Sequence, residues 1–276
     1  MQTLIKPRTS FQWFDWKLLY QYRDLLGLWV KRDLTAKYRQ TILGPLWFML
    51  HPLVTSLVFV LIFSRGLQIP TEGVPASLFY LTGLLVWNYV SQCLNSTSMT
   101  LVAHSGLFRK VFFPRLILPF SYCLSSLMAM GIQLGVLGGI YGVLVLQGAT
   151  TRPSLFVLAL PVLILQLIVL SFGLGLWISA LTVRFRDFHH LWSLISPLWL
   201  YASPISYPLS ALPADLRWIV ELNPLTFILE GFRLAILGVG IFHWEQWGVS
   251  ALLTLMIGIS GILIFQKMER SCVDSL

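Results

Sequence analysis

The fold is decided by the stretch K-R-D-L-T-A-K-Y-R-Q-T-I-L-G-P-L-W-F-M-L-H-P, from Lys31 to Pro52. Its first nine residues carry four basic side chains and one acid, and after Arg39 no charge appears before Arg65. Because proline lacks a backbone donor and disfavours helix at the preceding residue, a new helix is expected to begin at Gly44-Pro45. The stretch predicts a basic, helix-compatible platform joined directly to a membrane helix. The alternative is a stop-transfer flank whose charges only fix orientation.

The composition indicates an integral membrane protein. Hydrophobic residues make up 57% of the chain and charged residues 11%, whereas a soluble chain carries about 25% charged residues. The first 40 residues are charge-rich and lack a long apolar core, so no cleavable signal peptide is expected. Cys93, Cys123 and Cys272 have neither metal-ligand spacing nor an even number, which argues against a disulfide framework. The net charge of +8 is not gathered on one soluble region, so nucleic acid is not an expected partner.

Residues 1–40 are expected to form a cytosolic N-terminal segment with an amphipathic interfacial helix. Apolar residues recur at three- and four-residue spacing from Leu18 to Trp29, while polar and charged residues mark another side. Such a pattern suits a helix at the level of the lipid headgroups. It equally suits a helix packed on a protein partner, and one helix can do both.

Six transmembrane spans are predicted, because a span needs about 20 apolar residues. They fall at about 44–64, 76–95, 116–146, 154–182, 190–208 and 246–266. The fifth contains three prolines, at 197, 204 and 208. Together the spans define a transmembrane domain over 41–270, followed by a cytosolic tail at 271–276. The predicted fold is therefore an all-α membrane protein.

The region between the fifth and sixth spans predicts a re-entrant helical hairpin over about 216–242. Its apolar pieces are too short to cross, and Asn223-Pro224 interrupts them. Glu230 and Arg233 stand at i, i+3 on a helix, where they can neutralise each other. Ionisable groups at membrane depth are costly and usually functional. These four residues are expected to form an outer gate; alternatively, Glu230 and Arg233 form a structural ion pair that pins the hairpin.

Loop charges predict the orientation. With both termini in the cytosol, 15 Lys and Arg residues lie inside and four lie outside, at 65, 152, 217 and 233. This excess agrees with the positive-inside rule.

A nucleotide site is absent from the sequence. A P-loop needs a glycine directly before its lysine, and none of the six lysines follows a glycine. Transport would need energy from a separate ATPase.

A helical turn at about 107–113, ended by Pro114, combines an apolar face with a basic pair and suits docking into a groove of that ATPase. A membrane-surface turn is the alternative. The residues of this predicted contact are Phe108, Arg109, Lys110, Val111 and Phe112, and a second cytosolic contact would use Arg184, Arg186 and Asp187.

Aromatic residues near the spans are candidates for the transport path, since rings stack on sugar faces, although Trp and Tyr also form interface belts in any membrane protein. The candidates are Trp47, Phe48, Trp87, Tyr89, Trp192, Trp199 and Tyr201.

No catalytic site is expected, because the acids are scattered and no D-x-D pair occurs. Asp187, His189 and His190 lack a further carboxylate or cysteine nearby, so no metal site is expected either.

Three motifs together resemble a known family. They are R-D-L-T-A-K-Y-R-Q-T-I-L-G-P-L-W at 32–47 with L-H-P at 50–52, V-R-F-R-D-F-H-H-L at 183–191, and L-N-P-L-T-F-I-L-E-G-F-R at 222–233. In this order they resemble the permease subunit of type-2 ABC exporters, in the branch that exports O-antigen, capsule or teichoic acid. The resemblance implies a homodimer in the bacterial cytoplasmic (inner) membrane, without a cofactor of its own. It also implies two ATPase subunits that bind ATP and Mg, and an undecaprenyl-type lipid-linked polysaccharide as substrate.

The basic end of the platform (Lys31, Arg32, Lys37 and Arg39) is then expected to attract the pyrophosphate of the lipid carrier, or simply anionic lipid. Within this family a drug, lipid or other small-molecule exporter is the alternative. An ion-coupled transporter would need buried mid-span carboxylates, which the six spans lack. A membrane-bound glycosyl- or acyltransferase is disfavoured by the missing catalytic residues.

Overall fold

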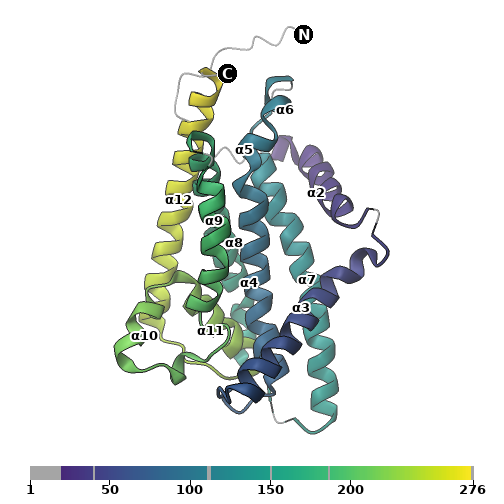
Figure 1. Cartoon of the computed structure of the whole chain (residues 1–276), viewed down its shortest axis with the longest axis vertical. Helices are drawn as coiled ribbons and strands as arrows, with labels where there is room; N and C mark the ends of the chain where they lie inside the picture. The colour runs from purple at the N-terminus through teal and green to yellow at the C-terminus, as the bar shows by residue number, and fades with distance from the viewer. Residues whose placement is uncertain (1–19, 40, 111–112, 150, 186, 275–276) are drawn as a thin grey trace.

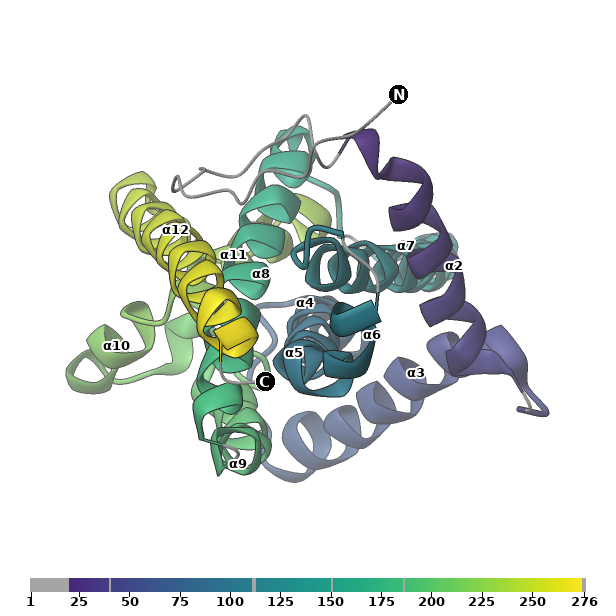
Figure 2. The same cartoon turned by 90° about the horizontal axis from the view of Figure 1, so that it is seen from above.

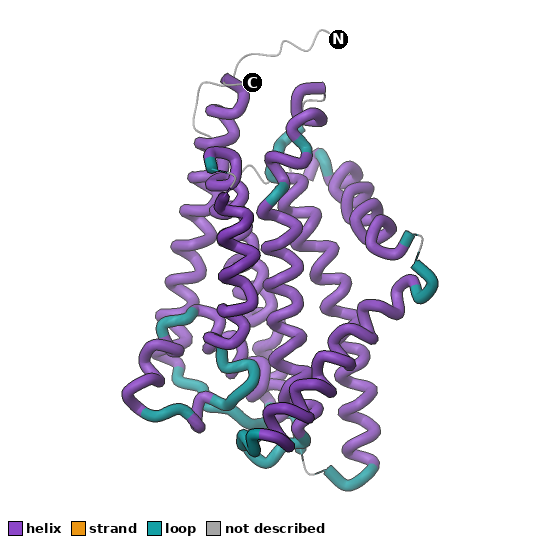
Figure 3. The backbone as a smooth tube through the Cα atoms, viewed as in Figure 1, coloured by secondary structure: helices purple, strands orange, loops and turns teal. Residues whose placement is uncertain are grey.

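The structure is a computed structural model that describes residues 20–39, 41–110, 113–149, 151–185 and 187–274. Within these ranges it includes all side chains except those at 38, 105, 109, 110, 214 and 270–274. The described chain is all-helical, without a strand (Figure 3). The predicted fold class, an all-α membrane protein, is confirmed.

The α-helices follow one another through short turns and loops. They are α2 (Arg23–Tyr38), α3 (Trp47–Phe59), α4 (Ala76–Ser98), α5 (Thr100–Ala103), α6 (Ser105–Lys110), α7 (Ile117–Leu146), α8 (Leu160–Arg184), α9 (Asp187–Ala202), α10 (Ala214–Glu221), α11 (Pro224–Leu237) and α12 (Trp244–Asp274). Short 3-10 turns occupy Gly44–Leu46, Leu155–Ala159 and Leu209–Ala211, and a π-helical segment, Val60–Gly66, continues α3.

The stretch that decides the fold forms two helices joined by a sharp turn. α2 ends at Tyr38, and the chain turns at Gly44, whose φ of +51° is costly for any residue with a Cβ. The backbone N–H of Gly44 donates to the Thr41 hydroxyl at 3.1 Å. Pro45 then opens the 3-10 turn that leads into α3. The predicted start of a new helix at Gly44-Pro45 is confirmed.

The elements divide between two ends of the bundle (Figure 1). α2, α6 and the C-terminal part of α12 lie at or near one end, here called the α6 end. α10, α11 and the loops after the π-helical segment and after α7 lie at the other, here called the α11 end. α3 crosses the bundle obliquely. Elements that the sequence assigns to one side of a membrane therefore gather at one end of the molecule.

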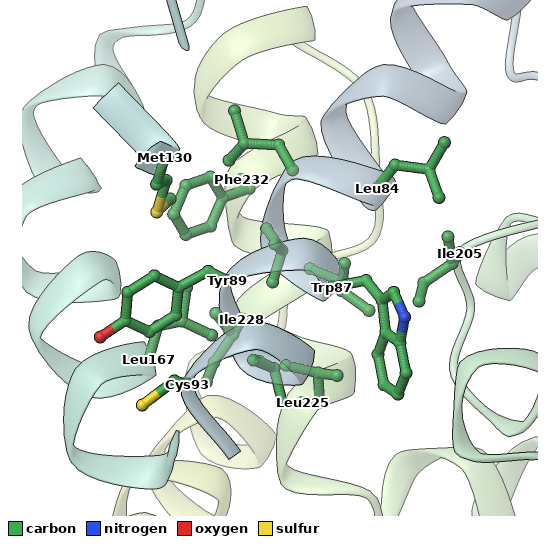
Figure 4. Close-up of a cluster of buried hydrophobic side chains, with 14 of the residues drawn as sticks. Leu84, Trp87, Tyr89, Cys93, Met130, Leu167, Ile205, Leu225, Ile228 and Phe232 are labelled. Atoms are coloured by element: carbon green, nitrogen blue, oxygen red, sulfur yellow. The ribbon is translucent and has the colours of Figure 1, made fainter. Parts of the chain in front are cut away.

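α4 is the central helix (Figure 2). It packs against α3, α7, α8, α9 and α11. Figure 4 shows how side chains of α4, α7, α8, α11 and the turn after α9 meet there. The buried cluster includes Leu84, Trp87, Tyr89, Cys93, Met130, Leu167, Ile205, Leu225, Ile228 and Phe232. Because most of its surface is covered by protein, α4 can carry polar residues such as Thr82 and Thr97, both fully buried.

α8 and α12 approach until their backbones touch. A Cβ added to Gly173 of α8 would lie 2.7 Å from the Cα of Gly258 in α12, and one added to Gly261 would collide with the Gly173 carbonyl. Small residues allow such close approach between membrane helices. The two helices therefore meet directly through their backbones at Gly173, and the Val169 side chain of α8 packs against Gly258.

Four helices of the described chain are long and apolar enough to cross a membrane: Gly44–Gly66, Ile117–Leu146, Leu155–Arg184 and Trp244–Glu269. They coincide with the first, third, fourth and sixth predicted spans. α4 coincides with the second. The helix that corresponds to the fifth, α9, stops at Ala202, whereas the predicted span extends to about residue 208. Pro204 disfavours helix at Ser203, and residues 203–206 form a buried turn instead.

Candidate functional site

α2 lies against the beginning of α7 through its apolar side. Three of its partly buried side chains, together with Tyr22 directly before the helix, pack on the buried cluster at the α6 end, namely Leu25, Leu26 and Trp29 on Phe113, Ile117 and Leu118. The amphipathic pattern predicted for this segment is therefore used for packing within the chain. Leu18 and Leu19, which belong to the same pattern, lie outside the described residues.

An acid within α2 holds the helix to α7. The Asp33 carboxylate accepts a short hydrogen bond from the Ser125 hydroxyl and pairs with Lys37 Nζ at 2.7 Å. Both side chains of the pair keep some contact with the surface, 14% exposed for Asp33 and 26% for Lys37. Lys37 thus neutralises a structural acid and is not a free positive charge.

The other predicted entrance residues are exposed. Lys31 and Arg39 extend at the surface. The Arg32 guanidinium lies 4.4 Å from the centroid of the Trp29 ring, an attractive cation–π arrangement. Trp29 in turn packs edge-on to His104 at 5.5 Å. Burial lowers the pKa of His104; its hydrogen bond to the Thr100 carbonyl opposes this shift, and the Arg32 charge adds to it. Of the four residues, Lys31 and Arg39 are best placed to meet an anion.

The first three residues of the predicted ATPase contact, 108–110, lie at the end of α6. Phe108 is partly buried, packs against Phe113 at 5.6 Å between ring centroids, and belongs to the apolar cluster under α2. It therefore anchors the segment to the bundle, and its contact with an ATPase stays a prediction. Val111 and Phe112 lie outside the described residues, as do the side chains of Arg109 and Lys110.

Arg115 belongs to none of the predicted contacts, yet it joins α6 to α12 at the α6 end. Its guanidinium lies 5.2 Å from the Phe108 ring centroid. Its Nη1 donates to the Glu269 backbone carbonyl of α12 at 2.8 Å, and its Nε lies 3.6 Å from the Glu269 carboxylate. A charge directly after Pro114 was the only sequence signal, because Glu269 lies 154 positions away.

The second predicted cytosolic contact lies at the connection between α8 and α9. Arg184 ends α8 and is exposed, with its guanidinium 5.4 Å from the Phe185 ring centroid. Asp187 begins α9 and is exposed too. Arg186 lies outside the described residues. The structure places this connection at the same end as α6 (Figure 1).

At the α11 end, Glu230 and Arg233 form a completely buried ion pair, with 0% of either side chain exposed and 2.9 Å between Arg233 Nη1 and Glu230 Oε1. Arg233 Nη2 donates to the Ile205 carbonyl at 3.1 Å, and the guanidinium stacks 3.9 Å from the Phe79 ring centroid. Glu230 Oε2 accepts from the Ile241 N–H at 3.0 Å. The local pairing predicted from the i, i+3 spacing is therefore formed. Arg233, counted among the outer loop charges, is instead a core residue.

Asn223 begins α11 and fastens it. Its Oδ1 caps the helix by accepting from the Leu225 N–H at 3.1 Å, and its Nδ2 donates to Ser203 Oγ at 2.9 Å. The next residue, Pro224, has its carbonyl bonded by Ser250 Oγ of α12 at 2.7 Å. The break between α10 and α11 therefore falls where Asn223-Pro224 predicts it, and it is held by polar contacts to two other elements.

The two arms of the predicted hairpin differ in burial. α11 is enclosed by α4, α8 and α12. α10 exposes Leu216, Trp218 and Ile219, while its Glu221 binds Arg217 at 2.9 Å and Gln246 of α12 at 3.1 Å. Both arms are short and apolar in sequence, so this difference in burial is not predictable from the sequence.

The seven aromatic candidates for the transport path differ in how much of each side chain is exposed. Trp87, Tyr89 and Trp192 are core residues, 6%, 1% and 8% exposed. Trp87 packs edge-on to Trp199 at 5.7 Å, and the Trp192 indole donates to Asn95 Oδ1 at 2.9 Å. Phe48 and Trp199 are partly exposed, whereas Trp47 and Tyr201 are more than half exposed. Only these last two present most of a ring at the surface of the chain.

Comparison with known proteins agrees with this architecture. Residues 25–237 match the family model described as ABC-2 type transporter. The O-antigen export system permease protein RfbA of Klebsiella pneumoniae is 27% identical over 255 residues, covering 92% of this chain and 95% of that protein. A protein of the same name from Myxococcus xanthus is 32% identical over 252 residues, with 90% and 91% covered.

A further relative is the capsule polysaccharide export inner-membrane protein CtrC of Neisseria meningitidis serogroup A. It is 23% identical over 260 residues, covering 91% of this chain and 94% of that protein. The family match extends over more than half of the chain, and the relatives match it almost from end to end. This multi-pass membrane protein belongs to the ABC-2 type transporter family.

Proposed function

We propose that the chain is the permease subunit of an ATP-driven ABC exporter that carries a lipid-linked cell-surface polysaccharide across the bacterial cytoplasmic membrane. The observation that carries the proposal is the match along nine-tenths of both chains to proteins named for O-antigen and capsule polysaccharide export. An all-helical bundle with a basic platform at one end and the buried helix α11 at the other fits that role.

Energy comes from a separate ATPase subunit, which binds ATP and Mg. The reason is that no lysine of this chain follows a glycine, so a P-loop is absent from its sequence. Two ATPase subunits dock on two copies of the permease at the α6 end, through the segment that contains α6 and through the α8–α9 connection. Phe108, packed on Phe113, fixes the first of these contacts to the bundle.

The α6 end faces the cytosol, in agreement with the distribution of basic residues. Six spans cross the membrane: the four apolar helices, together with α4 and α9. The 23 residues of α4 measure about 34 Å at 1.5 Å per residue, enough for a hydrocarbon core of about 30 Å. Its polar residues are tolerated because its neighbours, not lipid, cover them. α9 is shorter than α4, and the buried turn at residues 203–206 continues this span through the remaining thickness of the membrane.

The polysaccharide passes between two copies of the chain. Trp47 and Tyr201, which expose their rings, supply sugar-stacking surfaces along this path. Lys31 and Arg39 meet the pyrophosphate of an undecaprenyl-type carrier at the entrance. The re-entrant hairpin made by α10 and α11 closes the outer end, and the Glu230–Arg233 pair keeps α11 in place.

The proposal is tested by deleting the gene for this chain in its host bacterium. We expect surface polysaccharide to be lost while lipid-linked glycan accumulates on the cytosolic side, and expression of the intact chain should restore export. A variant of the co-purifying ATPase that lacks its P-loop lysine should give the same phenotype. Normal surface polysaccharide in the deletion strain would refute the proposed function.

A further inference from the structure

α12 makes contacts near both ends of the bundle (Figure 1). It runs unbroken from Trp244 to Asp274, 31 residues without a proline, which corresponds to about 46 Å. Its C-terminal part lies near α6, and its first turns lie beside α10 and α11. A continuous helix held at both ends can carry a displacement from one end to the other.

At the α6 end the Arg115 guanidinium contacts α12. Arg115 follows the predicted ATPase-contact segment, stacks on Phe108 and binds Glu269 through both the backbone carbonyl and the carboxylate. Only 15% of the Arg115 side chain is exposed. Arg115 thus joins the segment expected to meet the ATPase to the last turns of α12 that the structure describes.

Along its length α12 is seated on α8 through backbone contact, with Gly258 and Gly261 against Gly173. The Val169 side chain of α8 also packs against Gly258, so backbone and side-chain contacts together hold the two helices at this level. Protein interiors packed in this way shift between discrete arrangements and do not deform continuously.

At the α11 end α12 holds both arms of the hairpin. Ser250, 2% exposed, donates to the Pro224 carbonyl that opens α11 and accepts from Gln166 of α8 at 3.0 Å. Gln246 donates to Glu221 at the end of α10. These bonds lie on either side of Asn223, where the hairpin turns.

We propose that α12 is a rigid strut that transmits movement of the ATPase-contact segment to the outer hairpin, and that Arg115 is the positioning residue which fixes this strut to the segment. The inference rests on the proposed function, because it needs an ATPase to move the segment. Loss of Arg115 should leave ATPase binding and ATP turnover in place while the hairpin stops responding to ATP.

The test uses the complex of the full chain with its co-purifying ATPase in lipid vesicles. The three native cysteines are replaced, and Leu222→Cys supplies one thiol at an exposed position of the hairpin. In the parent, ATP with Mg and vanadate should change the labelling rate of this thiol by about fivefold, the lower end of measured coupling between sites. In Arg115→Gln the change should fall below about twofold, with ATPase yield and turnover retained.

Two further variants keep the result interpretable. Arg23→Gln alters an exposed arginine of α2 and should preserve the full response. Arg115→Cys combined with Glu269→Cys should lose the response, and a short bismaleimide that bridges the two thiols should restore it, which a merely destabilised protein would not show.

If the Arg115→Gln variant showed the same ATP-dependent change in Leu222→Cys labelling as the parent, the proposed role of α12 would be refuted. A parent complex that hydrolyses ATP without any change in labelling would refute it as well. The absence of a co-purifying ATPase would instead refute the proposed function itself.

Discussion

Two ion pairs, one near each end of the molecule, use the same kinds of group at one helical turn's spacing. Asp33 and Lys37 lie on α2 and keep 14% and 26% of their side chains exposed. Glu230 and Arg233 lie on α11 with no exposure at all. The first pair fastens a surface helix to α7 through Ser125, while the second is enclosed by Phe79, Ile205 and Ile241.

The difference teaches that burial, and not the pairing itself, determines what such a pair does. A partly exposed pair adds little stability and can be rearranged by water or lipid. A buried pair adds little net stability over an apolar replacement, but removal of one partner leaves a charge that nothing compensates. The Glu230–Arg233 pair therefore fixes how α11 packs on its neighbours, whereas the Asp33–Lys37 pair holds α2 less rigidly.

Glu230→Gln should have the largest effect. It leaves the Arg233 guanidinium buried without its counter-charge, which costs about 3–5 kcal/mol. Thermal unfolding of the purified protein in detergent should show a clearly lowered midpoint, together with reduced export. Glu245→Gln, at an exposed position near the start of α12, is the matched control and should unfold like the parent. Equal midpoints for both variants would mean that the pair is solvated.

The double substitution Glu230→Arg with Arg233→Glu tests whether the pair needs its backbone contacts as well as its opposite charges. The sequence alone leads one to expect partial recovery, because the charges are swapped on one helix face. The structure predicts little recovery, since an arginine at position 230 would face the Ile241 N–H and a glutamate at position 233 would face the Ile205 carbonyl. Recovery beyond half of the lost stability would show that these backbone contacts are unimportant.

Asp33→Asn should have an intermediate effect. It removes the charge that Lys37 and Ser125 share, at a cost of about 1–3 kcal/mol, and should loosen α2 from α7 without unfolding the bundle. Faster labelling of a cysteine placed at Leu25, under the helix, would reveal the release. Asp24→Asn, whose side chain is 94% exposed, serves as control. The same labelling rate in both variants would contradict a fastening role for Asp33.

Lys31→Gln and Arg39→Gln should have the smallest effect. Each should weaken retention of anionic lipid by about 1 kcal/mol and leave the unfolding midpoint unchanged, because both side chains are exposed. Native mass spectrometry of the protein with anionic lipid measures this retention. Export should fall more than membrane insertion, and equal losses of the two would favour attraction to bulk lipid over capture of a carrier.

Local patterns were predictable from the sequence, whereas distant contacts were not. The turn at Gly44-Pro45, the break at Asn223-Pro224 and the Glu230–Arg233 pair depend on neighbours within a few residues, so spacing and backbone chemistry suffice. The Arg115–Glu269 bond joins residues 154 positions apart, and no local pattern marks it. The burial of Trp87, Tyr89 and Trp192 was equally hidden, because an aromatic residue in an apolar helix looks the same whether it faces lipid, a path or the core.

The central position of α4 also has a consequence for biosynthesis. Asn95 of α4 is bonded to Trp192, which lies 97 residues later in the chain. At about 5–20 residues per second, Trp192 is synthesised roughly 5–20 seconds after Asn95. During that interval the polar groups of α4 lack the helices that later cover them, and bare hydrocarbon is a poor environment for them. The insertion machinery therefore has to shelter α4 until α8 and α9 arrive, so the order of synthesis is itself a constraint on this fold.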